Sequence, residues 1–187
     1  MNIFYIDKSP AKCAEQMVDK HVVKMILETA QLLSTAHRIL DGIEYTEKKY
    51  VPGSLPPRYR NVKRWSLDTD RDKVLYQATH INHPSAVWCR QSNNNYNWLF
   101  AHFLSLLNEY TYRYGKRHKC SDPAFVDALR QPPLSIPVGY FTPVTPAMAD
   151  EYIISNDSVT NYRNYYSKGK VHLHKWTKRQ PPDWLVA

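Results

Sequence analysis

The sequence lacks the features that mark membrane-spanning and secreted proteins. No apolar run approaches the length that crosses a bilayer, and the opening residues MNIFYIDKSP hold no basic leader with a cleavage site. The cysteines Cys13, Cys89 and Cys120 are odd in number and have no CxxC spacing, which argues against a disulfide framework. We therefore expect a cytoplasmic protein (in the host cytosol if it is phage-encoded) with no membrane association.

Motifs for several kinds of chemistry are also missing. The sequence has no P-loop, no GxGxxG and no GxSxG pattern. His80, His83 and Cys89 are close in sequence, but a zinc site needs three or four ligands with coherent spacing, and nothing completes this set. We expect no metal ion and no organic cofactor.

Positive charge and tyrosine are what the sequence has in excess. The 25 Lys and Arg residues outnumber the 17 Asp and Glu residues, so the net charge is +8. Such a balance favours a nucleic-acid partner, with a solvated basic surface as the alternative. The 14 Tyr and 5 Trp residues, against 5 Phe, supply stacking faces with a polar end. No protein partner is indicated.

Apolar spacing predicts an all-α fold. We expect residues 1–187 to form one compact domain, a bundle of about three main helices with long irregular loops. Helix-start signals at Ser9-Pro10 and at His83-Pro84 support the first two helices. Residues 42–67 contain three prolines and are predicted to be a loop. The three helices are expected at about residues 11–40, 85–114 and 157–176.

The first helix carries a file of polar side chains on an otherwise apolar surface. In DKHVVKMILETAQLL, residues 19–33, a single face holds His21, Lys24, Glu28 and Gln31, with Lys20 at its border. Burying an unpaired charge is costly, so this face should meet a cleft, a partner charge or water. The alternative is an ordinary surface pair between Lys24 and Glu28, with His21 hydrogen-bonded nearby.

Two other segments have the composition of nucleic-acid contacts. The segment NYRNYYSKGK, residues 161–170, interleaves aromatic rings with cations, as stacking and phosphate binding require. The alternative is a helix with core tyrosines and solvated lysines. The predicted loop adds Arg58 and Arg60, either as DNA contacts or as a solvated linker. His83, at a helix start, is expected to bond in the core or to meet a phosphate. The candidate residues of the first segment are Tyr162, Arg163, Tyr165, Tyr166, Lys168 and Lys170.

Three segments, taken in order, resemble the pyrimidine-dimer DNA glycosylases of the phage endonuclease V type. They are DKHVVKMILETAQLL, NHPSAVW leading into the helix that closes with EYTYRYGK, and YRNYYSKGK. That family has a D-x-H motif and then a catalytic Glu, which here are Asp19, His21 and Glu28. The resemblance implies a mostly helical repair enzyme that acts on double-stranded, damaged or modified DNA.

The resemblance also implies a reaction and its residues. In the family, the α-amine of the first residue attacks the sugar C1′, releases the base and forms a Schiff base, and β-elimination follows at the abasic site. This assigns catalysis to Met1 and Glu28, with His21 and Lys24 beside them. An α-amine has a reference pKa near 8, so a useful fraction is neutral at pH 7. The family exposes a small residue by removing the initiator Met, whereas residue 2 here is Asn2.

Two other functions remain open from the sequence. The same scaffold could act on an altered pyrimidine in phage DNA, with Glu28, His21 and Lys24 lining the pocket and no role for the N-terminal amine. A non-catalytic nucleic-acid-binding protein would need only the aromatic and basic segments.

Overall fold

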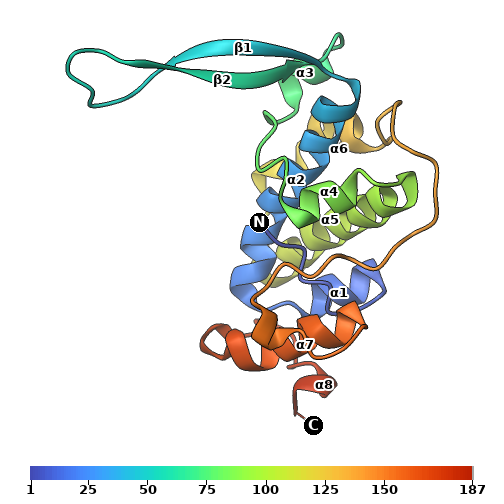
Figure 1. The fold of residues 1–187 in the computed structure, drawn as a ribbon. Helices are drawn as coiled ribbons and strands as arrows, with labels where there is room; N and C mark the ends of the chain where they lie inside the picture. The colour runs from blue at the N-terminus through green and yellow to red at the C-terminus, as the bar shows by residue number, and fades with distance from the viewer. Residues whose placement is uncertain (187) are drawn as a thin grey trace.

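The computed structural model describes residues 1–186, which form a mainly helical body with one projecting β-hairpin (Figure 1). The α-helices are α1 (Pro10–Gln16), α2 (Asp19–Asp41), α3 (Arg71–Val74), α4 (Pro84–Cys89), α5 (Asn93–Tyr114), α6 (Pro123–Leu129), α7 (Ser158–Gly169) and α8 (Asp183–Val186). The 3-10 helices are η1 (Lys119–Ser121), η2 (Asp150–Tyr152) and η3 (Val171–Leu173). The strands are β1 (Ile43–Tyr50) and β2 (Tyr59–Ser66).

The two long helices α2 and α5 form the centre of the body. Their apolar faces pack together, and Ile26 and Leu33 of α2 and Leu99 and Phe103 of α5 are fully buried. The helix α1 lies against α5, and α4 lies against α2. Within residues 1–186 we find no helix whose length and apolar character together suffice for crossing a bilayer.

Several helix ends lie where capping residues predict them. The hydroxyl of Ser9 accepts from the backbone N–H of Lys12 at the start of α1. His83 caps α4, accepting from the backbone N–H of Ser85. Gly115 ends α5 in the left-handed conformation, with φ 66°.

The prediction of about three main helices is wrong. The first predicted helix breaks at Met17 and Val18, whose backbones are extended, and the second breaks between Cys89 and Asn93. At the first break, the Met17 carbonyl accepts a hydrogen bond from the Arg113 guanidinium, 2.9 Å away. This contact between segments distant in sequence replaces a helical bond, which a local apolar pattern cannot reveal.

The all-α prediction is also wrong, because the predicted loop contains a β-hairpin. β1 and β2 pair in antiparallel register from Ile43–Ser66 to Tyr50–Tyr59. Pro52, Pro56 and Pro57 all fall in the connecting turn, where they remove no hydrogen bond of the strand ladder. Both faces of β1 are exposed, so the strand shows no alternation between apolar and polar residues.

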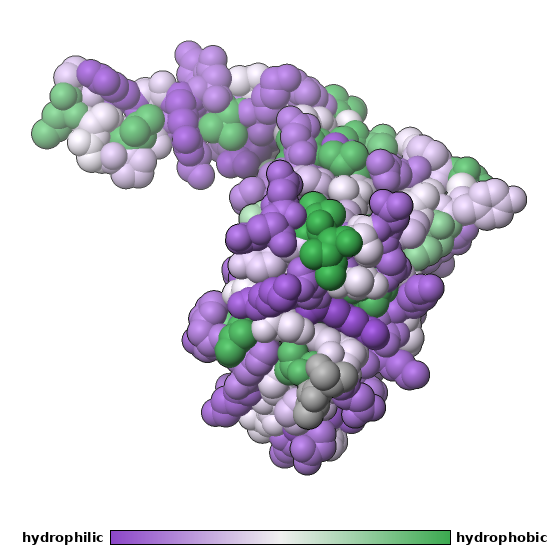
Figure 2. Space-filling model, turned by 60° about the horizontal axis from the view of Figure 1, so that its bottom comes forward, coloured by the Kyte–Doolittle hydropathy of each residue, from purple (hydrophilic) through white to green (hydrophobic). Residues whose placement is uncertain are grey.

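The hairpin is fixed to the body at the end of α2. Gly42 makes this turn, and a Cβ at that position would overlap the carbonyl oxygen of Arg38. The fully buried Arg38 guanidinium donates to the carbonyls of Trp65, at 2.6 Å, and Tyr76, at 2.7 Å, and pairs with the Asp72 carboxylate. These bonds tie the base of β2 to α2. Figure 2 shows hydrophilic surface along the hairpin and a hydrophobic region at its far end.

Candidate active site

A hollow of about 270 Å³ lies where the N-terminus meets α2 and the C-terminal segment. Three parts of the chain that are distant in sequence contribute to it. It contains all of the residues predicted to be catalytic, namely Met1, His21, Lys24 and Glu28. The lining is completed by Asn2, Phe4, Lys20, Met25, Lys170 and Leu173.

The Glu28 carboxylate connects the N-terminus to α2. Its Oε2 accepts from the backbone N–H of Asn2 at 3.0 Å, and its Oε1 pairs with the Lys24 Nζ at 3.2 Å. The Glu28 side chain is only 14 % exposed, whereas that of Lys24 is 69 % exposed. A mostly enclosed carboxylate thus faces the start of the chain, and its cationic partner reaches toward solvent.

The side chain of Asn2 holds the N-terminus in this position. Its Oδ1 accepts from the backbone N–H groups of Ile3, at 2.8 Å, and Phe4, at 3.1 Å, and its Nδ2 donates to the Ala147 carbonyl at 2.7 Å. Phe4 adopts a positive φ of 53°, an uncommon conformation for a bulky residue. The strained backbone and the three bonds direct Met1 into the hollow.

The pKa of His83 depends on its burial and on charges at the pocket. Burial lowers the pKa of His83, and the positive charge of the Met1 amine lowers it further, whereas Glu28 acts in the opposite direction. The amine, the carboxylate and this imidazole are therefore within electrostatic reach of one another. His83 does not line the hollow itself but borders a neighbouring one beside β2.

His21 is held as a neutral imidazole. Its Nδ1 shares a hydrogen bond with the Tyr166 hydroxyl, and its ring stacks on Phe4 with centroids 4.0 Å apart. Burial lowers its pKa to about 3, with further contributions from Lys170 and Lys24. At neutral pH the group can therefore shape the pocket or exchange a hydrogen bond, but it does not carry a positive charge.

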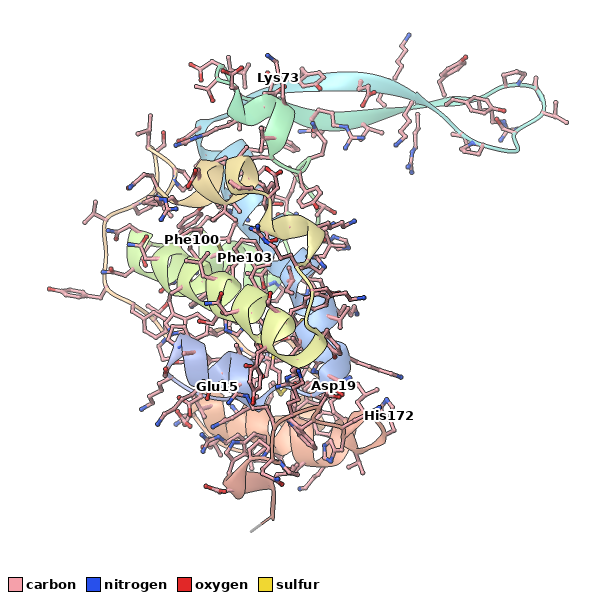
Figure 3. The ribbon with its side chains drawn as sticks, turned by 180° about the vertical axis from the view of Figure 1, so that it is seen from behind. Glu15, Asp19, Lys73, Phe100, Phe103 and His172 are labelled. Atoms are coloured by element: carbon pink, nitrogen blue, oxygen red, sulfur yellow. The ribbon has the colours of Figure 1, made fainter. Side chains whose placement is uncertain are left out.

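Asp19, the first residue of the D-x-H motif, lies outside the hollow and has a structural role. Its carboxylate accepts from the Arg113 Nη1 at 3.0 Å, and from the backbone N–H and the hydroxyl of Thr177 at 2.9 and 2.7 Å. Burial opposes ionisation, but these hydrogen bonds prevail and lower the pKa of Asp19. In Figure 3, Asp19 lies between Glu15 on α1 and the C-terminal segment bearing His172. The motif Asp thus fastens that segment to α2.

Four predicted DNA-contact residues lie in or near the hollow. Lys20 and Lys170 line it. Tyr165 is half-buried, with its ring centroid 6.1 Å from that of Phe4 and the Lys170 Nζ 4.6 Å from its own centroid. Tyr166 lies beneath, fully buried and bonded to His21. The aromatic-basic segment therefore contributes a cation to the pocket, and the half-buried Tyr165 ring lies beside that cation.

The remaining predicted contacts lie elsewhere. Tyr162 is fully buried and bonded to the backbone near Ala147, Arg163 donates to the Ile6 carbonyl, and Lys168 is exposed. Gln31 is half-buried on α2, outside the hollow. The last two, Arg58 and Arg60, belong to the hairpin, with Arg60 on β2 and Arg58 just before it.

Sequence reasoning missed several residues of the pocket wall. Asn2, Phe4, Met25 and Leu173 carry no motif, and only the folded chain brings them together. The bond between the Asn2 backbone and Glu28 joins residues 26 positions apart, so no local spacing could reveal it. Within residues 1–186, no group of three or more His, Cys, Asp or Glu side chains is arranged to hold a metal ion.

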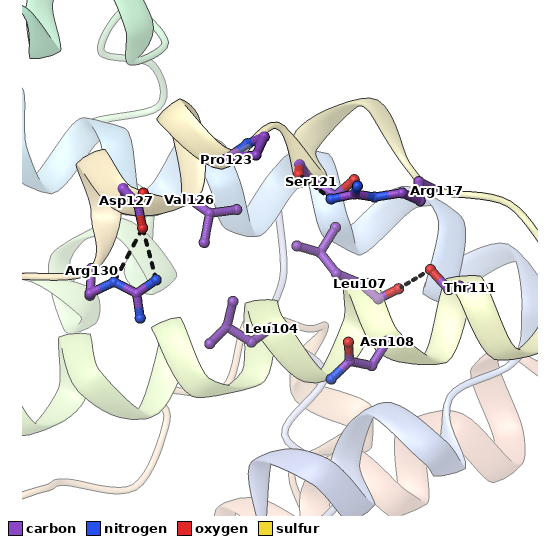
Figure 4. Close-up of a pocket in the computed structure, with 10 residues that line it drawn as sticks. All are labelled: Leu104, Leu107, Asn108, Thr111, Arg117, Ser121, Pro123, Val126, Asp127 and Arg130. Atoms are coloured by element: carbon purple, nitrogen blue, oxygen red, sulfur yellow. Dashed lines mark hydrogen bonds and ion pairs between the residues drawn. The ribbon is translucent and has the colours of Figure 1, made fainter.

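A larger hollow, of about 310 Å³, lies between α5 and α6 (Figure 4). The charged groups on its wall are already satisfied. Arg130 pairs with Asp127 at 2.8 Å, and Arg117 donates to the Ser121 carbonyl. Leu104, Leu107 and Val126 supply apolar lining. Chemistry therefore favours the smaller hollow, where the start of the chain meets the Glu28 carboxylate.

The pocket combines three lysines, the start of the chain and a mostly enclosed carboxylate on a mainly helical body. Residues 1–122 match the family model of the pyrimidine dimer DNA glycosylases, so the chain belongs to that family. Membership makes it a DNA glycosylase-type protein with DNA as its substrate. The matched region holds the N-terminus, α2 and α5 but ends before α7. No match was found among curated proteins or among solved structures.

Proposed function

We propose that the protein is a pyrimidine-dimer DNA glycosylase with abasic-site lyase activity on double-stranded DNA. The observation that carries this proposal is the 3.0 Å contact between the Glu28 carboxylate and the Asn2 backbone nitrogen, in a pocket that Met1 also lines. A nucleophilic amine and a group that accepts protons are the two requirements of Schiff-base chemistry at a sugar carbon.

The proposed reaction begins with the neutral amine. Its nitrogen bonds to the sugar C1′ as the bond from C1′ to the base breaks, and the base takes up a proton as it leaves. Glu28 accepts the proton that the attacking nitrogen loses. It passes this proton to the sugar O4′ as the bond from C1′ to O4′ breaks, which opens the ring and leaves the cationic Schiff base. A proton then leaves C2′, the 3′ phosphate departs, and water hydrolyses the Schiff base to restore the amine.

Two nitrogens can serve as the nucleophile. With Met1 in place, the nitrogen in contact with Glu28 is an amide and is not nucleophilic, so the Met1 amine acts from one residue away. If Met1 is removed, the Asn2 nitrogen becomes the free amine and already lies 3.0 Å from the carboxylate. The geometry therefore suits Asn2 better, and sequencing the trapped peptide distinguishes the two.

The cations at the pocket rim would hold the DNA. Lys20, Lys24 and Lys170 offer ammonium groups to phosphates around the reacting sugar. Tyr165 offers the partly open ring on which a displaced base could stack. In this proposal Lys168 and His83 contact flanking phosphates, and the contacts of Tyr162, Tyr166 and Arg163 within the body support α7.

Borohydride trapping on a duplex that contains one abasic site tests the proposal. The intact protein should form a covalent adduct, and Glu28→Gln should lower the trapping rate by about 100-fold or more. Glu151→Gln, which removes an exposed carboxylate of η2, is the matched control and should trap normally. The proposal fails if no adduct forms, or if Glu28→Gln traps as well as its control.

Blocking the N-terminus separates the second candidate function. An enzyme that processes an altered pyrimidine without the amine would keep its turnover after N-terminal acetylation, but would still lose it in Glu28→Gln. The amide character of the nitrogen beside Glu28, as long as Met1 remains, is the observation that favours this alternative. The lyase proposal expects acetylation to abolish trapping.

A further inference from the structure

The β-hairpin of residues 43–66, hereafter the arm, has no role in the pocket chemistry. Its two eight-residue strands extend roughly 25 Å. Beyond its base the arm packs against nothing in the described chain, and an isolated two-stranded hairpin is only marginally stable in water. It also exposes large apolar side chains, including Ile43, Tyr59 and Leu55, the last of them 92 % exposed. Such exposure marks a contact surface.

Charge divides the arm into two halves. Near the base, both acidic residues are paired, Glu44 with Lys63 at 2.8 Å and Glu47 with Arg64 at 3.0 Å. From residue 48 to residue 60 the sequence has no acid. The cations of this outer half are exposed, and none forms an ion pair within residues 1–186. They are Lys48, Lys49, Arg58 and Arg60.

The tip of the arm is apolar. Leu55 and the prolines that follow it project from the turn, and the Tyr50 and Tyr59 rings meet edge to face at its neck, with centroids 5.9 Å apart. Figure 2 shows this hydrophobic end beyond the hydrophilic stem. A small apolar wedge set among cations is the design with which proteins enter the minor groove and part a base step.

The base of the arm lies beside His83. The hollow that His83 borders is lined on its other side by residues 62–65 of β2. The Arg38 bonds to Trp65 and Asp72 fix that base, so the arm leaves the body in a set direction. Figure 1 shows it projecting away from the helices.

We propose that the arm is a second DNA-binding element, whose cations follow the phosphates beside the reacting nucleotide and whose Leu55 tip enters the minor groove. This inference rests on the proposed function, since it needs duplex DNA in the pocket. A 25 Å arm covers about seven base pairs of duplex, at two phosphates for every 3.4 Å. The arm thus extends the DNA contact from the phosphates beside the reacting nucleotide over several further base pairs.

Salt dependence of binding tests the cations. The variant Lys49→Gln, Arg58→Gln, Arg60→Gln removes three arm charges, and Lys12→Gln, Lys116→Gln, Lys119→Gln removes three exposed charges outside both pocket and arm. On a duplex of about 30 base pairs, the arm variant should bind about tenfold or more weakly, and the slope of log K against log salt should fall by about 2 to 3. The control variant should keep the slope of the unaltered protein.

Duplex length and the tip residue sharpen the test. On a duplex of about 8 base pairs, centred on the abasic site and too short to reach the tip, the arm variant should bind and trap like the unaltered protein. Leu55→Ser should weaken binding to the long duplex severalfold without changing the salt slope, because it removes an apolar contact and no charge. A length-independent defect, or equal effects of arm and control variants, would overturn the proposal.

The outcomes keep the two proposals apart. If Glu28→Gln traps normally on the short duplex, the proposed function fails, whatever the arm variants do. If trapping requires Glu28 but the arm variant binds the long duplex with unchanged affinity and slope, the arm inference fails and the function stands. Because the substituted arm side chains are exposed, all variants should show the same circular dichroism spectrum.

Discussion

The guanidinium groups of Arg113 and Arg60 have opposite surroundings. Arg113 is buried on α5, and Arg60 is on the arm. Arg113 is 2 % exposed and donates to Glu109 at 2.7 Å, to Asp19 at 3.0 Å and to two backbone carbonyls. Arg60 is exposed, lies opposite Lys49 in the hairpin register and forms no ion pair within residues 1–186. The charge of Arg113 is neutralised inside the protein, and the charge of Arg60 faces solvent.

This difference changes the meaning of the net charge of +8. Buried arginines such as Arg38 and Arg113 bind carboxylates and carbonyls inside the molecule, so they attract no ligand. Several cations without an ion pair in the described residues lie at the pocket rim and on the outer arm, namely Lys20 and Lys170 at the rim and Lys48, Lys49, Arg58 and Arg60 on the arm. A count of basic residues therefore predicts a polyanionic partner, but only the ion pairs reveal where that partner can bind.

The largest effect we expect is from Arg113→Met. Removing this guanidinium leaves the carboxylates of Asp19 and Glu109 with fewer partners in a buried site, although Arg179 still pairs with Glu109. The free energy of unfolding should fall by about 3–5 kcal/mol. Urea denaturation measures it. Arg113→Lys should recover only part of the loss, because an ammonium cannot reproduce the four-bond fork. Equal stability of Arg113→Met and the unaltered protein would contradict the comparison.

Acidification should have the next largest effect on the stability of the helical body. Burial lowers the pKa of His21 to about 3 and those of His37 and His102 to about 4. Between pH 4 and 6.5 the unfolded chain therefore binds more protons than the folded one, and stability falls as the pH falls. The three histidines together should cost about 3 kcal/mol between pH 6.5 and 5.5.

Denaturation at several pH values checks this expectation. His102→Gln should reduce the pH dependence by roughly one third, since each histidine contributes at most one proton. His80→Gln, which alters a histidine of the surface loop before α4, should leave the pH dependence unchanged. Stability that stays constant between pH 6.5 and 5.5 would mean that these histidines are protonated in the folded protein.

Tyr166→Phe should have a smaller effect on stability and a distinct one on the pocket. The substitution removes the hydroxyl bonded to the His21 Nδ1 and keeps the buried ring. The expected loss is about 1 kcal/mol. The variant should also form the borohydride-trapped adduct more slowly, because the orientation of the His21 imidazole toward Phe4 and the pocket is no longer fixed. Tyr162→Phe, which removes another buried hydroxyl of α7, is the matched control for trapping.

The sequence predicted the elements whose signals are local. Helical spacing puts His21, Lys24 and Glu28 on one face of α2, and all three line the hollow, whereas Gln31 of the same file lies outside it. Gly115 and Ser9 likewise set helix ends by their own conformations and hydrogen bonds. These features depend on residues within a few positions of one another.

The features that were missed depend on contacts between distant segments. The break at Met17 depends on Arg113, and the wall of the pocket depends on Asn2, Phe4 and Leu173. The arm escaped prediction for a different reason. Its strands expose both faces, so the alternation that identifies a half-buried strand is absent, and its prolines suggested an irregular loop.

The smallest expected effect completes the comparison of the two arginines. Arg60→Met should change the free energy of unfolding by no more than about 0.5 kcal/mol, because the side chain is exposed and forms no ion pair in the part of the chain described. The same substitution at Arg113 should cost several times more, although both remove one guanidinium and add one thioether. Parallel urea denaturation of the two variants measures the ratio. If Arg60→Met destabilises the protein as much as Arg113→Met does, then the arm is part of the folding core, and its cations are not available to DNA.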